Sequence, residues 1–362
     1  MRRRHYLASL PALLAGCLDQ SSDDPSSPTP SPTTSDETPT PTVTPEPTPE
    51  PFGCDPTLTR PDASSLSRHD VESAIEEVDP SLLVEMAVPE FGSAESDQPE
   101  EYVISHPEPP DEPIVGVVEP TVGTVPGEVE FTIHNHSDQQ FSFNPAGPSL
   151  WRAGDGTWSR IGPREKTLTI TGIEPGETYS WTFDLKSAVR GFWIGGRGRE
   201  IGGVGPGVYA FVIDGTLEEP DEPFGAESGG SLTVVAIFGL AGDPLTVEPE
   251  PAIAEDDGVA RVPSEEDDET EELLIEPVED ADGSLTLEQA AQPRHLVRGL
   301  PYLFCEELPE EIIVEVPEHQ ARGVVANVGL LAGLEDPREG PTRISLLNES
   351  FELSSRNPDR GD

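Results

Sequence analysis

The stretch Val129-Glu130-Phe131-Thr132-Ile133-His134 alternates apolar and polar side chains at every position. Because successive side chains of a β-strand point to opposite faces, this period of two predicts a strand with one buried face. The alternation returns at Phe141 and Phe143, and again over residues 179–185, where tyrosine, tryptophan, phenylalanine and leucine share one face. These segments predict a sheet protein whose core is rich in aromatic residues.

Turn residues separate further apolar segments on both sides of this stretch. Residues 150–161 predict a hairpin around Gly154-Asp155-Gly156, and apolar runs follow at 209–213 and 232–240. The glycine-rich run from Gly195 to Arg199 is predicted as a loop. Several short strands between turns predict an antiparallel β-sandwich over residues 113–247. We expect its core to contain Phe131, Ile133, Trp181, Phe183, Tyr209 and Phe211.

Three of these segments carry a family resemblance. Val129 to Ser137 ends in Asn-His-Ser, Glu174-Pro175-Gly176 leads to Trp181-Thr182-Phe183-Asp184-Leu185, and Pro206-Gly207-Val208-Tyr209 follows. Their order resembles that of bacterial immunoglobulin-like surface domains. The resemblance implies an immunoglobulin-like interaction domain and names no partner. The glycine-rich insert at 191–205 is longer than such a connection needs.

The first 17 residues predict export. Arg2-Arg3-Arg4 precedes a short apolar run, residues 6–15, which is too short to span a bilayer as a helix. Leu14-Ala15-Gly16-Cys17 resembles a lipobox, and Arg3-Arg4-His5-Tyr6-Leu7 resembles the twin-arginine export motif. We therefore predict a signal peptide at 1–16, a lipid on Cys17, and a location on the extracytoplasmic face of the cell membrane.

Two segments are expected to join this anchor to the sandwich. Residues 17–51 are almost wholly Ser, Thr, Pro, Asp and Glu after the cysteine, a composition that predicts a disordered stalk. Residues 52–112 are a mixed segment in which Arg68 to Val78 has helical spacing and predicts one short helix.

The chain is strongly acidic. Its formal net charge is −49, from 70 acidic and 21 basic residues, and only Lys166 and Lys186 are lysines. Such a field repels nucleic acid, anionic lipid and acidic substrates, so none of these is an expected partner. The composition resembles that of proteins from salt-loving archaea, where molar salt shortens the Debye length to about 3 Å. An acidic disordered chain is the alternative interpretation, which the strand pattern of residues 113–247 disfavours.

The last third divides into an acidic linker and a small unit. Residues 248–272 contain the run Glu265 to Glu272 and predict a solvated linker. Residues 273–362 contain a helix candidate at 285–292 and apolar runs at 312–316, 324–331 and 344–353. They predict a small α+β unit.

Three cysteines divide unevenly between two roles. With Cys17 lipidated, Cys54 and Cys305 remain in an oxidising compartment. We predict that these two pair in a disulfide; the alternative is two unpaired cysteines, with Cys305 buried.

Two groups of residues are candidate metal ligands. Asp280-Ala281-Asp282-Gly283 resembles the middle of a calcium-binding EF-hand loop, but the positions expected for two strong ligands hold Val278 and Gln289. An Asx-type turn that caps the helix from Leu285 explains the same residues without calcium. Among the histidines, His134 and His136 could chelate a metal together with His106, or be exposed polar residues of a sheet.

No motif for catalysis is present in the sequence, and no cofactor is predicted. Asn135-His136-Ser137 and Asn348-Glu349-Ser350 match the N-glycosylation sequon. We therefore predict a non-enzymatic, lipid-anchored surface protein that binds an unknown protein or surface-layer partner. The alternatives are a membrane-tethered solute-binding or transporter-accessory protein, and an extracytoplasmic hydrolase with unfamiliar residues.

Overall fold

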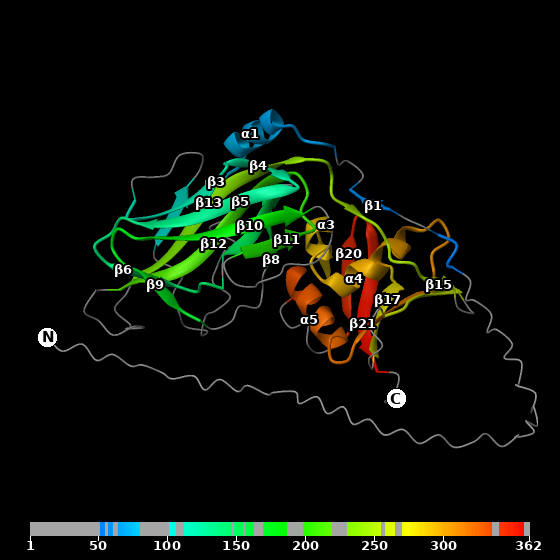
Figure 1. Ribbon diagram of the computed structural model, residues 1–362. Coiled ribbons are helices and arrows are strands. Elements are labelled where there is room, and N and C mark those ends of the chain that lie inside the picture. The colour runs from blue at the N-terminus through cyan, green and yellow to red at the C-terminus, as the bar shows by residue number, and fades with distance from the viewer. Residues whose placement is uncertain are drawn as a thin grey trace, which may run out of the picture. The chain divides into compact units, whose positions relative to one another are not determined.

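The computed structural model (Figure 1) describes residues 51–54, 57–60, 64–79, 101–105, 112–146, 148–154, 156–162, 169–186, 198–218, 230–254, 258–264, 270–334 and 340–357. All of them belong to one compact unit, Thr48–Asp362. The predictions for the signal peptide, for Cys17, for the stalk up to residue 50 and for His106 lie outside the described residues.

The described residues are mainly β. Two sheets face each other across one core and form a sandwich. The sandwich spans residues 101–242. The first sheet has the order β11 (Gly198–Gly202), β10 (Thr178–Lys186), β5 (Gly127–Asn135) and β3 (Ile114–Glu119). The second has the order β2 (Glu101–Ser105), β13 (Gly230–Gly242), β12 (Gly207–Glu218), β6 (Gln140–Phe143) and β9 (Thr171–Ile173). It also contains β4 (Val122–Val125), β7 (Ser149–Gly154) and β8 (Thr157–Gly162).

Most sandwich strands pair antiparallel, as predicted, but three pairs are parallel. β2 and β4 both run parallel to β13, and β11 runs parallel to β10. β11 lies in the glycine-rich insert and includes Gly198, so the prediction of a loop over 195–199 is wrong at its end. Glycine has no side chain to reveal a period of two, which is why this strand left no pattern in the sequence.

The core of the sandwich confirms the six side chains that were expected to point inward. Phe131, Ile133, Phe183, Tyr209 and Phe211 are fully buried, and Trp181 is 1 % exposed. Phe131 stacks on both Trp181 and Phe211, with ring centroids 5.3 and 5.4 Å apart. Because these rings come from both sheets, they hold the two layers together.

Replacement of Trp181 by alanine is expected to lower the free energy of unfolding by about 3–5 kcal/mol, the usual cost of removing a large buried aromatic side chain. The indole also donates a hydrogen bond from Nε1 to the Pro145 carbonyl oxygen, 3.2 Å away. Ile170→Ala is the control, because Ile170 is 62 % exposed. Denaturant unfolding in high salt should separate the two variants, and equal stabilities would contradict this account of the core.

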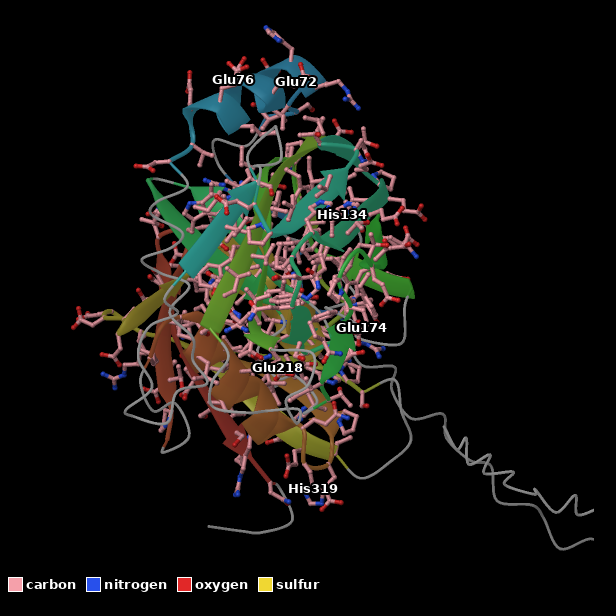
Figure 2. All side chains as sticks on the ribbon, turned by 90° about the vertical axis from the view of Figure 1, so that its left-hand side faces the viewer. Glu72, Glu76, His134, Glu174, Glu218 and His319 are labelled. Atoms are coloured by element: carbon pink, nitrogen blue, oxygen red, sulfur yellow. A yellow bond between two sulfur atoms is a disulfide. The ribbon has the colours of Figure 1, made fainter. Side chains whose placement is uncertain are left out.

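Helix α1 (Arg68–Glu77) covers the outer face of the second sheet (Figure 1). Ser67 and Asp70 form a capping box that starts it, as the helical spacing of 68–78 predicted. Val71 and Ile75 are buried against the sheet. The helix lies so close to β13 that a Cβ on Gly239 would be only 2.1 Å from the Val71 side chain, which explains the glycine at that position. Glu72 and Glu76 point away from it (Figure 2).

The C-terminal part, residues 253–357, is a seven-stranded sheet with helices. Its order is β15 (Ile253–Ala254), β16 (Val259–Val262), β19 (Glu311–Pro317), β17 (Thr270–Pro277), β21 (Glu349–Arg356), β20 (Thr342–Leu346) and β18 (Gly283–Leu285). Its helices are α3 (Leu287–Ala290), α4 (Arg294–Gly299), the 3-10 helix η2 (Leu300–Phe304) and α5 (Ala321–Leu331). β1 (Leu58–Thr59) and β14 (Thr246–Val247) form a separate two-stranded sheet.

The structure corrects the acidic linker predicted for 248–272. That segment contains β15, β16 and the start of β17, so the sheet begins at residue 253 rather than at 273. Glu272 is only 6 % exposed. Burial acts to raise the pKa of Glu272, but hydrogen bonds from Arg261 and Arg356 lower that pKa below its usual value. These two arginines explain why an acidic run can enter a sheet.

Candidate functional site

Buried glutamines join the sandwich to the C-terminal part. Gln289 Nε2 donates hydrogen bonds to the carbonyl oxygens of Arg160 in β8 and Leu331 in α5, at 2.9 and 3.0 Å. Gln292 Nε2 donates to the Gly202 carbonyl oxygen at the end of β11, 3.3 Å away. A buried amide is costly unless it is hydrogen-bonded, so these contacts favour one relative placement of the two parts.

A buried ion pair crosses the same junction. Arg152 in β7 and Glu288 in α3 approach to 3.1 Å between Nε and Oε1, and their side chains are 10 % and 2 % exposed. Tyr209 lies beside them and donates from its hydroxyl to the Gly205 carbonyl oxygen, 2.8 Å away. Burial raises the pKa of Tyr209 far above its usual value, so this hydroxyl stays protonated and remains a donor.

Next to the ion pair lies a cavity of about 150 Å³, the junction cavity. Arg60 and Ser64 line it from the segment around β1, and Arg152 and Glu288 line it from the two parts. Leu66 and Leu245, with two prolines, supply its apolar surface. Two arginines, a serine and a glutamate therefore line one small space together with apolar side chains, a mixed lining that is typical of sites for small solutes.

The junction is also closely packed at Gly203, which has a φ of +66°. A Cβ at this position would lie 2.7 Å from the Ala291 Cβ, whereas Gly176, with a φ of +78°, has open space around it. Both Gly→Ala variants carry about 1–2 kcal/mol of backbone strain. Gly203→Ala adds overpacking of about 1–3 kcal/mol. Gly203→Ala should therefore have a lower melting temperature than Gly176→Ala in thermal unfolding. Equal melting temperatures would contradict the close packing.

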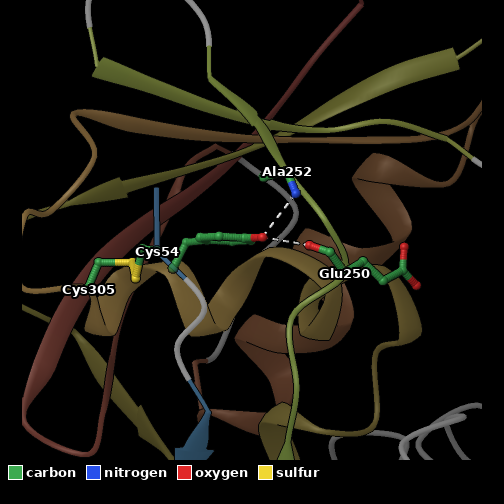
Figure 3. Close-up of a disulfide and its surroundings, with 5 residues drawn as sticks. Cys54, Glu250, Ala252 and Cys305 are labelled. Atoms are coloured by element: carbon green, nitrogen blue, oxygen red, sulfur yellow. Dashed lines mark hydrogen bonds between the residues drawn. A yellow bond between two sulfur atoms is a disulfide. The ribbon is translucent and has the colours of Figure 1, made fainter. Parts of the chain in front are cut away.

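Cys54 and Cys305 form a disulfide in the structure, with 6.1 Å between their Cα atoms (Figure 3). The neighbouring Tyr302 hydroxyl accepts a hydrogen bond from the Ala252 amide and donates one to the Glu250 carbonyl oxygen, at 3.0 and 2.7 Å. Residues 51–54 are thereby held on the C-terminal core, as the disulfide requires.

Asp280 and Asp282, the candidate calcium ligands, are both exposed. No group of three or more histidine, cysteine, aspartate or glutamate side chains gathers to hold a metal in the part of the chain that the structure describes. Thr286 caps α3 through a capping box with Gln289. The cap is therefore Thr286 and not an Asx turn, and α3 spans only Leu287–Ala290 of the predicted helix 285–292.

The two sequons differ sharply in exposure. Asn135 is 1 % exposed, and its Nδ2 donates to the carbonyl oxygens of Gln139 and Ile173 at 2.8 and 2.9 Å. Both amide hydrogens are engaged, so the folded chain leaves no place for a glycan there and the prediction for Asn135 is wrong. Asn348 is exposed, in the turn between β20 and β21 with a φ of +79°.

His134 and His136 lie side by side at the end of β5, with ring centroids 5.8 Å apart. Burial, and then the charge of His136, lower the pKa of His134, while Glu119 acts in the opposite sense. Figure 2 shows His134 on its strand of the sandwich. His134 is half-buried and His136 is exposed, while His106 lies outside the described residues.

Sequence reasoning missed the junction residues Arg152, Glu288, Gln289 and Gln292. One signal was available: Glu288, Gln289 and Gln292 interrupt a segment whose other residues are apolar or small. Polar residues within such a segment are found buried when they have fixed partners, but their partners here are 42 to 129 residues away, so the sequence does not show them.

No helix in the described ranges is both long and apolar enough to cross a membrane. Comparison with protein families and with curated proteins gives no match to this chain.

Proposed function

We propose that this chain is a non-enzymatic, lipid-anchored protein of the extracytoplasmic membrane face, where its sandwich binds a protein or surface-layer partner. The observation that carries the proposal is the sequence Leu14-Ala15-Gly16-Cys17 after a cationic start and a short apolar run. Export by the twin-arginine route follows from Arg3 and Arg4. In this proposal residues 18–50 form a stalk between the lipid and the folded part, which begins at Pro51, a residue that bridges to Ile253.

The disulfide supports the proposed location. Disulfides form and persist in oxidising compartments outside the cytoplasm and are rare inside it. Cys54 and Cys305 are paired, and Cys17 alone is left for a lipid. The count of cysteines therefore agrees with one lipidated cysteine and one extracytoplasmic disulfide.

The outer face of the first sheet supports an interaction role. Glu128, Glu130 and Asp184 are exposed there, on the side of β5 and β10 opposite the aromatic core. Two facing sheets and the aromatic layer between them are also what an immunoglobulin-like domain would require. The acidic surface supports a role in concentrated salt, where screening relieves the repulsion between such charges.

The lipid anchor is tested by Cys17→Ser. We expect the variant either to leave the membrane fraction or to accumulate there as an unprocessed precursor, because the lipid is added to the cysteine thiol. Ser21→Ala, four residues further along, is the control and should fractionate with membranes like the parent. A Cys17→Ser protein that is processed and still sediments with membranes would contradict the proposal.

A further inference from the structure

We propose that the side chain of Asn348 carries an N-linked glycan. Residues 348–350 read Asn-Glu-Ser, which is the sequon for this modification. The Asn348 Nδ2 atom forms a bond to C1 of a sugar, and the bond between C1 and the diphosphate of a lipid-linked sugar donor breaks. The diphosphate leaves as an anion, and the amide proton passes to a base of the transferase. The inference rests on the proposed location outside the cytoplasm, because the sequon is an acceptor in secreted proteins.

A two-residue turn presents Asn348 to solvent. Leu346 of β20 and Glu349 of β21 pair in register, which leaves Leu347 and Asn348 as the turn between the strands. Both turn residues have a positive φ, 49° and 79°, as a type I′ hairpin turn requires. Asparagine is among the residues that adopt this conformation most readily. Leu347 packs against the C-terminal core and holds the turn there, while Asn348 is exposed.

The side-chain atoms that define the acceptor are unoccupied. The structure describes residues 340–357 without a gap, so both strands that flank the turn belong to it. Within the described structure neither the Asn348 amide nor the Ser350 hydroxyl has a hydrogen-bond partner. Glu349, the middle residue of the sequon, is exposed as well. A transferase can therefore reach the acceptor amide without first breaking a side-chain hydrogen bond of the folded chain.

The other sequon shows the same motif in the service of the fold. Asn135 Oδ1 accepts hydrogen bonds from the amide and the hydroxyl of Ser137, at 3.0 and 2.6 Å, an Asx-type turn at the end of β5. The Asn135 amide nitrogen donates to two backbone carbonyl oxygens, and the residue is 1 % exposed. Acceptor and hydroxyl are thus both engaged at Asn135. Of the two sequons, the folded chain offers Asn348 alone for modification.

Mass spectrometry of the full chain extracted from membranes tests the proposal. Trypsin cleaves after arginine and lysine and releases residues 344–356, a peptide whose only asparagine is Asn348. We expect this peptide to exceed its sequence mass by a whole number of sugar residues, with fragment ions that place the sugars on Asn348. The peptide that contains Asn135 should have its unmodified mass.

Two substitutions at Ser350 form a matched pair. Ser350→Ala removes the sequon and should abolish the added mass, whereas Ser350→Thr preserves the sequon and should retain it. Asn348→Gly removes the acceptor but keeps a residue that adopts positive φ without strain, so it should lose the added mass and keep the turn. None of these changes removes a side-chain hydrogen bond of the described structure, and a cooperative thermal transition of each variant checks that it folds.

Three results would overturn the proposal. They are a peptide 344–356 of unmodified mass in the parent, an added mass that persists in Ser350→Ala, and a glycan on Asn135 in place of Asn348. The mass of the Cys17 peptide in the same sample separates this test from that of the anchor. A lipidated Cys17 with an unmodified Asn348 refutes the glycan alone, whereas absence of both modifications refutes the glycan and the anchor together.

Discussion

Removal of the disulfide by the double substitution Cys54→Ala/Cys305→Ala is expected to lower the free energy of unfolding by about 5 kcal/mol in the chain-entropy model. The two cysteines are 251 residues apart, so the bond restricts a very long loop of the unfolded chain. It also fixes the segment that carries Phe52, whose ring meets Tyr302 edge-on at 5.7 Å. Measured losses usually fall below the model value, because the reduced chain retains some structure.

Denaturant unfolding of three samples measures this effect. The oxidised parent should be the most stable, and the reduced parent and the double alanine variant should unfold at similar, lower denaturant concentrations. The reduced parent is the control for packing, because it keeps both sulfur atoms and loses only the bond. If reduction leaves the unfolding midpoint unchanged, the disulfide does not stabilise this fold.

The second large effect is expected at the ion pair that crosses the junction. Arg152→Met should lower the free energy of unfolding by about 3–5 kcal/mol, because it leaves the carboxylate of Glu288 buried without its charged partner. Glu288 is 2 % exposed, so water does not replace the lost arginine. The double variant Arg152→Met/Glu288→Met removes both charges and should recover most of the loss, since apolar residues of similar volume often replace a buried pair without cost.

The control for this cycle is an exposed ion pair of similar geometry. Arg343 Nε lies 2.8 Å from Glu352 Oε2, but the Arg343 side chain is 52 % exposed. Arg343→Met should therefore leave the unfolding midpoint nearly unchanged, as is usual for solvated pairs. Two results would contradict this account of the buried charge. In the first, the double methionine variant is as unstable as Arg152→Met. In the second, Arg343→Met is as unstable as Arg152→Met.

Local patterns revealed the elements that local chemistry decides. The alternation at 129–134 and 179–185 predicted β5 and β10, and the turn at 154–156 predicted the hairpin of β7 and β8. The helix from Arg68 was visible because its cap and its buried face lie within one short stretch of sequence. In each case the residues that decide the structure are neighbours in the chain.

Long-range pairing escaped prediction. The segment 248–272 reads as a linker because its charges dominate, yet Glu272 is held by Arg356, which lies 84 residues further on. β2 joins the sandwich by pairing with β13 across more than 120 residues, although it lies in the segment 52–112 assigned outside the sandwich. No pattern within one segment identifies such partners, because the stabilising contact exists only after both have folded.

The same limit applies to the candidate site. The sequence singled out Cys54 and Cys305 by counting, and the structure pairs them. Asp280 and Asp282 were chosen from a local motif, and among the described residues they belong to no group of three or more histidine, cysteine, aspartate or glutamate side chains. Arg60, Arg152 and Glu288 belong to no motif, and they meet only because β1, β7 and α3 come together at the junction. A cavity formed in this way is a property of the tertiary fold and has no local signature.

The N-terminus of the mature protein tests the central claim most directly. Mass spectrometry of the N-terminal peptide, from protein extracted from membranes with detergent, should find a chain that begins at Cys17 and carries the added mass of a lipid. A mature chain that begins at any other residue, or a Cys17 with an unmodified thiol, would contradict the account of this protein as a lipid-anchored surface protein.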